Sequence, residues 1–596
     1  MTYTAPLADM RFALREVADL ARVAAWPGYE HATDDTVDAV LEEAGKLAGN
    51  GLAPLNRDGD KVGAKLENGV VRTAPGFAGI YKEFVDGGWN SLPFDPEYGG
   101  QGMPWLLAAT VQEMWQAANM GFGLVLLLNQ GAIDAIHHHG SPGQKTAYLP
   151  KMISGEWTGT MNLTEPQAGS DLAQLKSRAV KAGDHYLVTG QKIFITYGEH
   201  DMAENIVHLV LARTPDAPAG VRGISLFIVP KFLVGADGKL GKRNDLRCVS
   251  LEHKLGIHAS PTCVMSFGDD GGAVGYLVGE EGRGLSYMFT MMNNARLSVG
   301  IQGLAIAERA YQQASAFAKV RVQSKDDGSA RAEPVSIVHH ADVRRMLMTM
   351  RAHVEAMRAL AYYTAAGIDN ALKHPDKDMA RRTQDRVDLL IPIVKAWCTD
   401  LGNEIASIGV QVHGGMGFIE ETGAAQHLRD ARILPIYEGT NGIQARDLVG
   451  RKIAKDGGET MLKLVAEMRA FAAEMKAAPG DDLLAIRTSL IASADALEEA
   501  TIWVAQTVKA ELASALAGSM PFLRLAGTAL GGWLLAKSAL AAQTRLASRD
   551  GDPAFLEAKL ITARFYAEVI VPPALAQLGP IKAAHRTVFA LTEAQL

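Results

Sequence analysis

The segment IYEGTNGIQ, residues 436–444, places one carboxylate, Glu438, among apolar neighbours and directly before Gly439 and Thr440. A glutamate in this position has two interpretations. It caps the N-terminus of a following helix, or it acts as a general base that takes a proton from a substrate. The apolar run RILPI before Tyr437 favours the base, because burial without a nearby cation raises a carboxyl pKa toward neutral pH.

Two further segments carry groups suited to a flat, polar ligand. MNLTEPQAGSDLAQLKS, residues 161–177, offers hydroxyls and a glycine that permits close approach, although Ser170 and Asp171 are equally suited to capping a turn. GQKIFITYGEHDMAE ends an alternating apolar run on Phe194 and Thr196. An aromatic ring and a threonine at a strand end can face a heterocycle, and they can equally be ordinary sheet packing.

A third pair of segments supplies Arg296, in NNARLSVGIQGLAIAERA, and the glycine-rich turn HGGMGF ahead of Glu438. Each of these motifs is weak by itself. Their order and spacing over several hundred residues are specific when they are taken together.

Several common site motifs are absent or unsuitable. The sequence has no GxGxxG, no GxxxxGK[ST] and no GxSxG, so the usual dinucleotide, P-loop and esterase signatures have no support. Three successive histidines at 137–139 point about 100° apart on a helix, which prevents them from converging on one metal ion.

The elements that must position these residues follow from hydrophobic periodicity. Apolar residues recur three and four apart up to about residue 155, alternate between about 160 and 280, and return to helical spacing from Leu285. A polar insert, QSKDDGSARAEPVS, is expected to be a loop. Beyond it, a stripe at helical spacing indicates the core of a further helical block: Met461, Leu464, Val465, Met468, Phe471 and Met475.

We therefore expect a mainly α-helical fold with a central antiparallel β domain. Residues 1–160 form an N-terminal helical domain and residues 161–282 a middle β domain. Residues 283–455 form a second helical domain, and residues 456–596 an extra C-terminal helical domain.

Composition restricts the class of protein. The chain has 596 residues and a net charge of −7, which disfavours nucleic acid as the main partner. Its three cysteines have no CxxC spacing, which disfavours a zinc site and a disulfide scaffold. The N-terminus lacks a signal-peptide pattern. The longest apolar stretch, LAGTALGGWLLAKSAL, is interrupted by Lys537 and is shorter than the roughly 20 residues of a membrane span. We expect a soluble, cytoplasmic protein without a membrane span.

With these motifs in place, the chain resembles the acyl-CoA dehydrogenases from about residue 40 to 450, and its last block resembles the extra helical domain of the longer members. The resemblance implies FAD, no metal, and an α domain, a β-barrel-like domain and a four-helix domain. It implies flavin contacts from Met161, Leu163, Thr164, Gly169, Ser170, Phe194 and Thr196, with Ser170 also near the pantetheine. It implies further cofactor contacts from Arg321, across a dimer interface, from Gln411, Gly414 and Gly415 at the ADP, and from Thr440.

The resemblance also assigns Glu438 as the catalytic base. In some relatives the base stands directly before the matched arginine, but that residue here is Ala295, which cannot accept a proton. Two positions depart from the family pattern, since Phe194 replaces the usual tryptophan and Asn293 replaces a commoner aspartate. The second change weakens the assignment at that position. The implied substrate-binding residues are Ser170, Asn293, Arg296 and Gly439.

The function implied by the resemblance is α,β-dehydrogenation of an acyl-CoA thioester. Glu438 removes the α-proton, a hydride passes from Cβ to flavin N5, and an electron-transfer flavoprotein accepts the electrons from a homo-oligomer, either a dimer or a tetramer. The stretches YEGTNGIQ and KLGIHASPTC are most similar to members that convert 3-(methylthio)propanoyl-CoA to 3-(methylthio)acryloyl-CoA in dimethylsulfoniopropionate degradation.

Three alternatives within the resemblance remain. A short- or medium-chain fatty acyl-CoA dehydrogenase of β-oxidation is the nearest, and an acyl-CoA oxidase that uses dioxygen is another. A few relatives bind DNA through a basic C-terminal domain, but Lys/Arg and Asp/Glu are nearly balanced from Arg451 onward, which disfavours that role.

Overall fold

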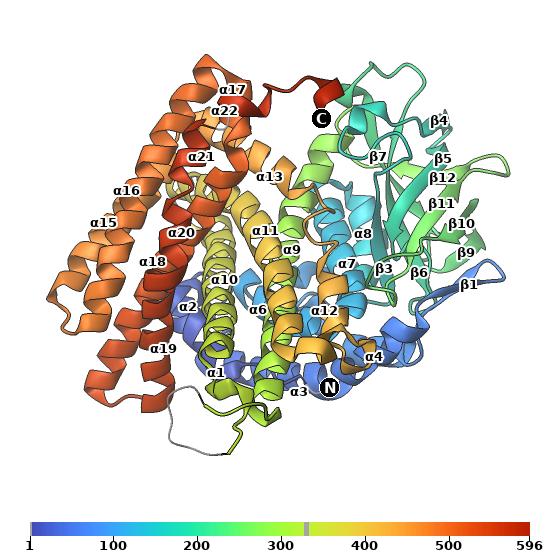
Figure 1. Ribbon diagram of the computed structural model, residues 1–596. Helices are drawn as coiled ribbons and strands as arrows, with labels where there is room; N and C mark the ends of the chain where they lie inside the picture. The colour runs from blue at the N-terminus through green and yellow to red at the C-terminus, as the bar shows by residue number, and fades with distance from the viewer. Residues whose placement is uncertain (1–2, 327–332, 584) are drawn as a thin grey trace. The chain divides into compact units, whose positions relative to one another are not determined.

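The computed structural model describes residues 3–326, 333–583 and 585–596, without the side chains at 290, 291, 293 and 294. The described residues form long helices, and most of the strands come from residues 157–277 (Figure 1). The chain divides into two compact units. The first comprises Glu43–Met103 and Met114–Ser298 with the start of the chain, and the second comprises Ala5–Glu42, Pro104–Glu113 and Val299–Leu596. The division into four domains stays a prediction.

The first unit contains an eight-stranded sheet. In order along the sheet, the strands are β10 (Leu246–Leu251), β11 (Thr262–Phe267), β5 (His185–Thr196), β12 (Ala273–Leu277), β7 (Ile224–Pro230), β6 (Asn205–Arg213) and β3 (Trp157–Asn162), and β4 (Arg178–Ala182) pairs with β5 and β6. Neighbouring strands are antiparallel, except that β3 runs parallel to β6 and β4 shares one parallel pair with β6. The expectation of an antiparallel sheet is therefore wrong at this edge, because β3 and β6 are not consecutive and no hairpin joins them.

Strand β5 joins two parts of this sheet. Residues 186–188 pair with β12, and residues 190–196 pair with β11. The strand alternates between buried and more exposed residues, whereas β7 is buried throughout its length. At the far end of β5, Ile195 is buried in the core of the sheet, whereas Phe194 is exposed and Thr196 is half-buried.

Helices α7 (Met120–His139) and α8 (Pro142–Ser154) pack beside β3. Asn129 Oδ1 on α7 accepts a hydrogen bond from the Gly159 N–H on β3 at 2.9 Å. A Cβ at Gly159 would lie 2.3 Å from the Ala132 Cβ, so only glycine permits this approach. The contact fixes the strand that leads into residues 161–177.

The long helices of the second unit are α10 (Ala341–Lys373), α11 (Lys377–His413) and most of α9 (Gly284–Val320), which the chain enters from the first unit. Gly303 of α9 and Gly402 of α11 allow these two backbones to touch. A Cβ at Gly303 would lie 2.4 Å from the carbonyl oxygen of Cys398. The close approach places α11 directly against α9.

The C-terminal part of the second unit is helical, as expected. Its main helices are α15 (Glu459–Glu474), α16 (Asp481–Ala510), α18 (Ser519–Ser548) and α19 (Pro553–Phe565). The stripe predicted as core is buried at Met461, Leu464, Val465, Met468 and Met475. Phe471 is only half-buried, which corrects the prediction there, because Ala472 takes the buried position instead.

Besides short 3₁₀- and π-helical turns, the described residues form further α-helices and strands. They are α1 (Leu7–Phe12), α2 (Leu20–Ala24), α3 (Asp34–Lys46), α4 (Ala53–Val62), β1 (Lys65–Glu67), β2 (Val70–Arg72), α5 (Phe77–Asp86), α6 (Trp105–Ala118), β8 (Phe232–Val234), β9 (Leu240–Arg243), α12 (Ala424–Ala431), α13 (Asn441–Asp447), α14 (Ala454–Asp456), α17 (Leu512–Ala517), α20 (Val571–Leu575), α21 (Leu578–Ala583) and α22 (His585–Val588). The polar insert expected as a loop lies partly outside the described residues.

Two described helices, α7 and α18, are long and apolar enough by length and composition to cross a membrane. Their most apolar windows are 89% and 78% buried within the protein, respectively. The stretch interrupted by Lys537 was expected to be too short for a span, whereas it belongs to the 30-residue helix α18. Burial inside the protein accounts for its composition, since core helices are apolar on most faces.

A buried charge network joins helices of the second unit. Arg358 on α10 donates to Glu113 at 3.1 Å, to Glu308 at 2.8 Å, and to Asp9. The Tyr362 hydroxyl donates to Glu113 at 2.6 Å. Burial opposes the guanidinium charge, but Glu113 and Glu308 outweigh it and hold the pKa of Arg358 well above its usual value. The network therefore fixes α10 against segments that are remote in sequence.

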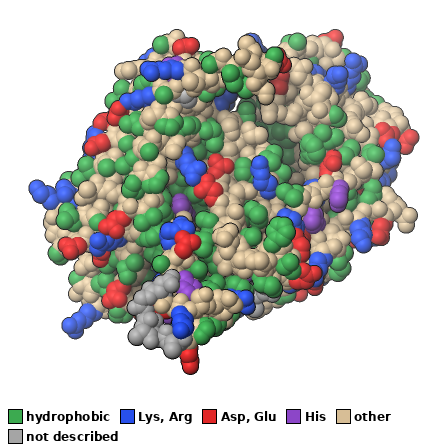
Figure 2. Space-filling view, viewed as in Figure 1, with side chains coloured by type: hydrophobic (Ala, Val, Ile, Leu, Met, Phe, Trp, Pro, Cys, Tyr) green, Lys and Arg blue, Asp and Glu red, His purple; other side chains and the backbone are tan. Residues whose placement is uncertain are grey.

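The surface carries charges of both signs. On the face shown in Figure 2, Lys/Arg and Asp/Glu side chains are interspersed and form no large patch of one sign. This distribution matches a total of 59 basic and 66 acidic residues.

Candidate active site

Glu438 lies in the turn between α12 and α13, and its side chain is half-buried. Its φ is +56°, and the φ of Gly439 is +83°. A left-handed backbone costs a non-glycine residue about 1–3 kcal/mol, so surrounding contacts must hold Glu438 in this conformation. Strained residues of this kind are concentrated at functional sites.

The residue that caps α13 is Thr440. Its Oγ1 accepts a hydrogen bond from the Ile443 N–H at 3.3 Å, as side chains at helix N-termini do. The capping interpretation of Glu438 is therefore wrong for this helix. The Thr440 hydroxyl keeps its own O–H for donation, so its contact with a cofactor stays a prediction.

Contacts on both sides hold the Glu438 turn in place. The Tyr437 hydroxyl donates to Gln302 Oε1 on α9, and burial, with a smaller effect from Glu438, raises the pKa of Tyr437 well above its usual value. Gln444 Nε2 donates to the carbonyl oxygens of Glu438 and Gly439, each at 3.2 Å. Helices of the second unit therefore fix the backbone that presents the carboxylate.

A buried ion pair organises residues 161–177 in the first unit. Glu165 accepts from Lys192 Nζ at 2.8 Å, from the Ser177 hydroxyl at 2.7 Å and from the Lys176 N–H at 2.6 Å. Lys192 also donates to the Leu163 carbonyl at 3.1 Å. Burial would raise the carboxyl pKa, but Lys192 and the hydrogen bonds outweigh it and lower the pKa of Glu165 to about 2. The pair ties this loop to β5.

Phe194 stands at the end of β5 beside this loop. Its φ is +60° and 59% of the residue is exposed, an unusual combination for a large aromatic side chain. The Ile193 N–H donates to the Thr164 carbonyl at 2.9 Å, and the Thr160 hydroxyl donates to the Thr196 carbonyl at 2.7 Å. A strained backbone that exposes a flat ring suggests a flat binding partner.

The loop and the strand end thus bring the predicted flavin contacts of the first unit together. Leu163 and Thr164 are half-buried, Gly169 and Ser170 are exposed, and Met161 is buried in β3. A Cβ at Gly169 would meet no atom within 4 Å, so the space beside it is open.

The structure shows which residue caps the turn in this loop and where one predicted substrate-binding residue lies. Asp171, and not Ser170, caps the short turn that follows, since its side chain accepts from the Ala173 N–H at 3.0 Å. Of the predicted substrate-binding pair on α9, Arg296 is buried, whereas the Asn293 side chain lies outside the described residues.

The remaining predicted cofactor contacts belong to the second unit. Arg321 is exposed directly after α9, and Gln411 is exposed in the last turn of α11. Gly414 has a φ of +60°, and a Cβ at Gly414 or Gly415 would meet no atom within 4 Å. These glycines leave backbone accessible for close approach by a ligand.

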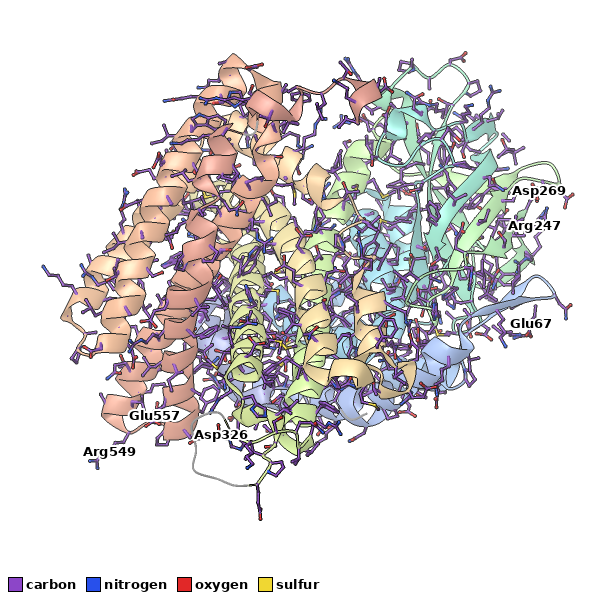
Figure 3. The ribbon with its side chains drawn as sticks, viewed as in Figure 1. Glu67, Arg247, Asp269, Asp326, Arg549 and Glu557 are labelled. Atoms are coloured by element: carbon purple, nitrogen blue, oxygen red, sulfur yellow. The ribbon has the colours of Figure 1, made fainter. Side chains whose placement is uncertain are left out.

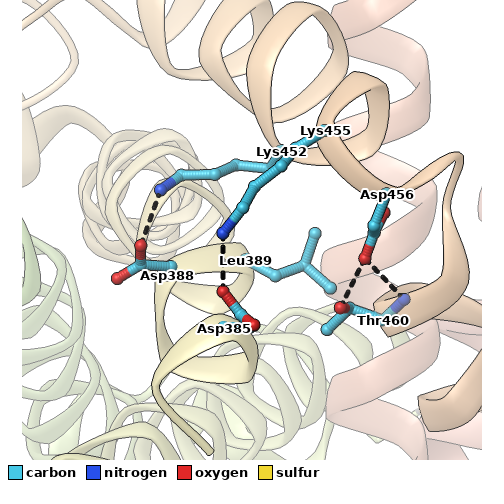
Figure 4. Close-up of a pocket in the computed structure, with 7 residues that line it drawn as sticks. All are labelled: Asp385, Asp388, Leu389, Lys452, Lys455, Asp456 and Thr460. Carbon is cyan, nitrogen blue, oxygen red and sulfur yellow. Dashed lines mark hydrogen bonds and ion pairs between the residues drawn. The ribbon is translucent and has the colours of Figure 1, made fainter. Parts of the chain in front are cut away.

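The pocket in Figure 4 contains none of the predicted site residues. Lys452 pairs with Asp388 at 3.1 Å, and Lys455 pairs with Asp385 at 2.7 Å. Because its charged groups already have partners, the pocket is a weak candidate for substrate recognition. No group of three or more His, Cys, Asp or Glu side chains is arranged to hold a metal among the residues that the structure describes.

Four family models match successive parts of the chain. They are described as the N-terminal domain (residues 35–156), the middle domain (160–269) and the C-terminal domain (282–454) of acyl-CoA dehydrogenase, and as "Acetyl-CoA dehydrogenase C-terminal like" (464–592). The chain is 50% identical over 580 residues to 3-methylmercaptopropionyl-CoA dehydrogenase of Ruegeria pomeroyi, with 96% of each chain covered.

The chain belongs to the acyl-CoA dehydrogenase family. It is also 35% identical over 608 residues to a butyryl-CoA dehydrogenase of Syntrophomonas wolfei, covering 99% of this chain and 98% of the relative.

Solved structures share the fold. Caenorhabditis elegans ACDH-11 in complex with C11-CoA aligns with a TM-score of 0.76 at 18% identity, over 95% of this chain and 91% of the other. A chain from the structure of the electron transferring flavoprotein of Acidaminococcus fermentans aligns with a TM-score of 0.58 at 27% identity, over 71% of this chain and 99% of the other.

As an acyl-CoA dehydrogenase, the chain is an FAD-dependent oxidoreductase, and its residues fit that cofactor. Phe194 exposes an aromatic face, Gly169, Gly414 and Gly415 leave open space beside the backbone, and Arg321 offers an exposed cation. These features suit an isoalloxazine ring and a diphosphate.

Sequence reasoning missed the buried residues that support this site. Lys192 and Glu165 hold the loop of residues 161–177, and Lys395, on α11, donates to the Gly439 carbonyl at 2.9 Å. The sequence did contain a sign that Lys192 and Lys395 are buried with specific partners. Lys192 directly precedes the apolar run of QKIFIT, and Lys395 interrupts the apolar run LLIPIVKAWC. A lysine is rarely buried without a specific partner.

Proposed function

We propose that this acyl-CoA dehydrogenase oxidises 3-(methylthio)propanoyl-CoA to 3-(methylthio)acryloyl-CoA with Glu438 as the catalytic base. The observation that carries the role of Glu438 is its left-handed conformation in a turn where Thr440 already caps the helix. A strained, half-buried carboxylate without a capping role is suited to proton transfer.

The reaction separates a proton and a hydride. The Glu438 carboxylate takes the α-proton, and the β-hydrogen leaves with its electron pair, so that a carbon–carbon double bond forms next to the thioester carbonyl. Bound FAD supplies the acceptor for that hydride. The Glu438 N–H is proposed to donate to the thioester carbonyl, where it would stabilise developing enolate charge by a few kcal/mol.

The proposed cofactor contacts are those of the two units already described. In the first unit, Phe194 would hold the flavin ring, beside the loop that Glu165 and Lys192 fix. In the second unit, Gly414 and Gly415 would leave room for the ADP moiety beside their backbone. Residues proposed to complete the cofactor site are Met161, Leu163, Thr164, Gly169, Ser170, Thr196, Arg321, Gln411 and Thr440, and those proposed to bind substrate are Ser170, Asn293, Arg296 and Gly439.

The substrate assignment is supported by 50% identity over 96% of the chain to the Ruegeria pomeroyi enzyme. The alternative, a short- or medium-chain fatty acyl-CoA substrate, is supported by 35% identity over 99% of the chain to the Syntrophomonas wolfei butyryl-CoA dehydrogenase. An electron-transfer flavoprotein is proposed as acceptor, with support from the similarity to a chain in that structure of Acidaminococcus fermentans.

The assembly and location are also proposals. Arg321 is exposed at the end of α9, where it could reach a cofactor bound by a second copy, so a homo-oligomer, either a dimer or a tetramer, is proposed. A cytoplasmic location is proposed because the described cysteines are buried and free, which suits a reducing compartment.

A steady-state comparison tests the substrate. We expect 3-(methylthio)propanoyl-CoA to have a higher kcat/KM than butyryl-, hexanoyl- or octanoyl-CoA, measured with an artificial electron acceptor. A much higher kcat/KM for octanoyl-CoA would refute the sulfur-containing substrate. Stoichiometric peroxide in the absence of an added acceptor would instead identify an oxidase.

A further inference from the structure

We propose that Lys395 is a positioning residue for the catalytic turn, and that its buried ammonium holds Glu438 in the conformation from which it takes the proton. This inference rests on the proposed role of Glu438 as base. It concerns a side chain on α11 that is separated from Gly439 by 44 residues of sequence.

Lys395 is completely buried in the second unit. Its Nζ donates to the Gly439 carbonyl and to Asn441 Oδ1, each at 2.9 Å. An ammonium is costly to remove from water unless hydrogen bonds compensate for the lost hydration. Two groups that accept hydrogen bonds from this ammonium, the Gly439 carbonyl and the Asn441 side chain, lie directly after Glu438, in the segment of residues 436–444 that we call the catalytic turn.

Asn441 extends the contact to the rest of α11. Its Nδ2 donates to Asp400 Oδ1 at 2.6 Å and to Thr399 Oγ1 at 2.9 Å, while its backbone N–H donates to the Pro435 carbonyl at 2.9 Å. The amide of Asn441 thus bridges the cation of Lys395 and the carboxylate of Asp400. Helix α11 thereby fixes Gly439 and Asn441, which follow Glu438, and Asn441 in turn holds Pro435, which precedes it.

The Gly439 carbonyl is the sensitive point in this arrangement. Glycine occupies both left- and right-handed regions readily, so Gly439 by itself does not keep the turn in one conformation. For Glu438, in contrast, the left-handed φ costs free energy. If the adjoining peptide can rotate, Glu438 returns to a more favourable backbone conformation. Lys395, together with Gln444, prevents that rotation by holding the carbonyl from the protein interior.

The main test compares Lys395→Met with Lys559→Met. Lys559 is also buried in the second unit and donates to Glu355 at 3.0 Å, but it has no contact with the turn among the interactions described. For Lys395→Met we expect normal FAD content, a kcat at least tenfold lower, and a KM within threefold of wild type. We expect a larger isotope effect with α-deuterated substrate and faster amide hydrogen exchange in residues 436–444.

The control and a conservative variant separate positioning from general destabilisation. Lys559→Met is expected to lower the melting temperature while leaving kcat and the exchange of residues 436–444 unchanged. Lys395→Arg retains donors and is expected to recover part of the lost kcat. If Lys395→Met does not accumulate as folded protein, Lys395→Gln, whose amide NH2 still donates hydrogen bonds, is measured instead, with intermediate kcat and exchange expected.

Two outcomes overturn different claims. Wild-type kcat, isotope effect and amide exchange in Lys395→Met, or in Lys395→Gln where that variant replaces it, would overturn the positioning role. Glu438→Gln is measured in parallel. Reduction of its flavin by substrate at the wild-type rate would instead overturn the role of Glu438 as the base. In that case the exchange of residues 436–444 still decides whether Lys395 holds the turn.

Discussion

Lys192 and Glu165 form an ion pair inside the first unit, with 2.8 Å between Nζ and Oε1 and side chains only 0% and 4% exposed. The pair joins β5, which carries Phe194, to the loop that contains most of the other predicted flavin contacts of that unit. Neither residue is predicted to touch the cofactor. Together they hold β5 and the loop, the two segments that carry the predicted cofactor contacts, at a fixed distance.

Replacing Lys192 with Met leaves Glu165 buried without its cation. We expect the protein to be destabilised by about 3–5 kcal/mol, because removing one partner of a buried ion pair exposes the full desolvation cost of the other. We also expect a lower ratio of FAD to protein, since the loop is no longer tied to β5. Denaturant unfolding and flavin absorbance measure the two effects.

The control for this variant is Lys181→Met on the exposed face of β4. It should change stability by no more than about 0.5 kcal/mol. Native FAD content together with native stability in Lys192→Met would contradict the role of the ion pair.

From the low pKa of Glu165 we also expect a specific dependence of stability on pH. Its pKa is lowered from 4.5 to about 2 in the folded protein, so its stabilising contribution is present above pH 4.5 and is lost as the pH falls toward 2. Glu165→Gln should therefore have a lower melting temperature at pH 6 and a flatter decline of melting temperature between pH 5 and 3.

The matched substitution is Glu67→Gln on the β1–β2 hairpin, where the side chain is exposed and projects away from the sheet (Figure 3). It should leave the acid decline as steep as in the wild type. An equally steep decline in Glu165→Gln would show that this carboxyl does not contribute to it.

Glu438→Gln should retain FAD and its yellow colour but fail to bleach on addition of substrate. The amide cannot take the α-proton, so the rate of flavin reduction should fall by about 10²–10⁴-fold. Stopped-flow absorbance gives this rate. Glu557→Gln, at an exposed position on α19 (Figure 3), should bleach at the wild-type rate. Bleaching of Glu438→Gln at that rate would be evidence for another base.

Phe194 should matter through its exposed ring. Phe194→Ala should weaken FAD binding roughly twofold to tenfold, which corresponds to the loss of about 0.5–1.5 kcal/mol of aromatic contact. Phe194→Trp should retain binding, because a larger ring occupies the same exposed position. Titration of apoprotein with FAD measures both affinities.

Val180→Ala removes a comparably exposed apolar side chain from β4, and we expect no change in FAD affinity from it. Equal affinities of Phe194→Ala and the wild type would exclude stacking by Phe194.

Much of the fold follows from the sequence, because helices and strands are set by local periodicity. The predicted return to helical spacing at Leu285 coincides with α9, and the alternating runs coincide with β5, β6 and β7. The parallel pairing of β3 with β6 was not predictable in this way. It depends on which strands meet after 40 or more residues of intervening chain, and alternation in one strand carries no information about its neighbour.

The sequence by itself showed an isolated carboxylate, Glu438, among apolar residues. Its assignment as the candidate base, with Ala295 unable to serve at the alternative position, came from the resemblance to the acyl-CoA dehydrogenases. Only the tertiary structure decided that Thr440 caps α13 and that Glu438 adopts a left-handed backbone. It also decided that Lys395 reaches the turn from a distant helix. The physical reason is that a buried charge is tolerated only beside its partners, and those partners are brought together by folding and not by proximity in sequence.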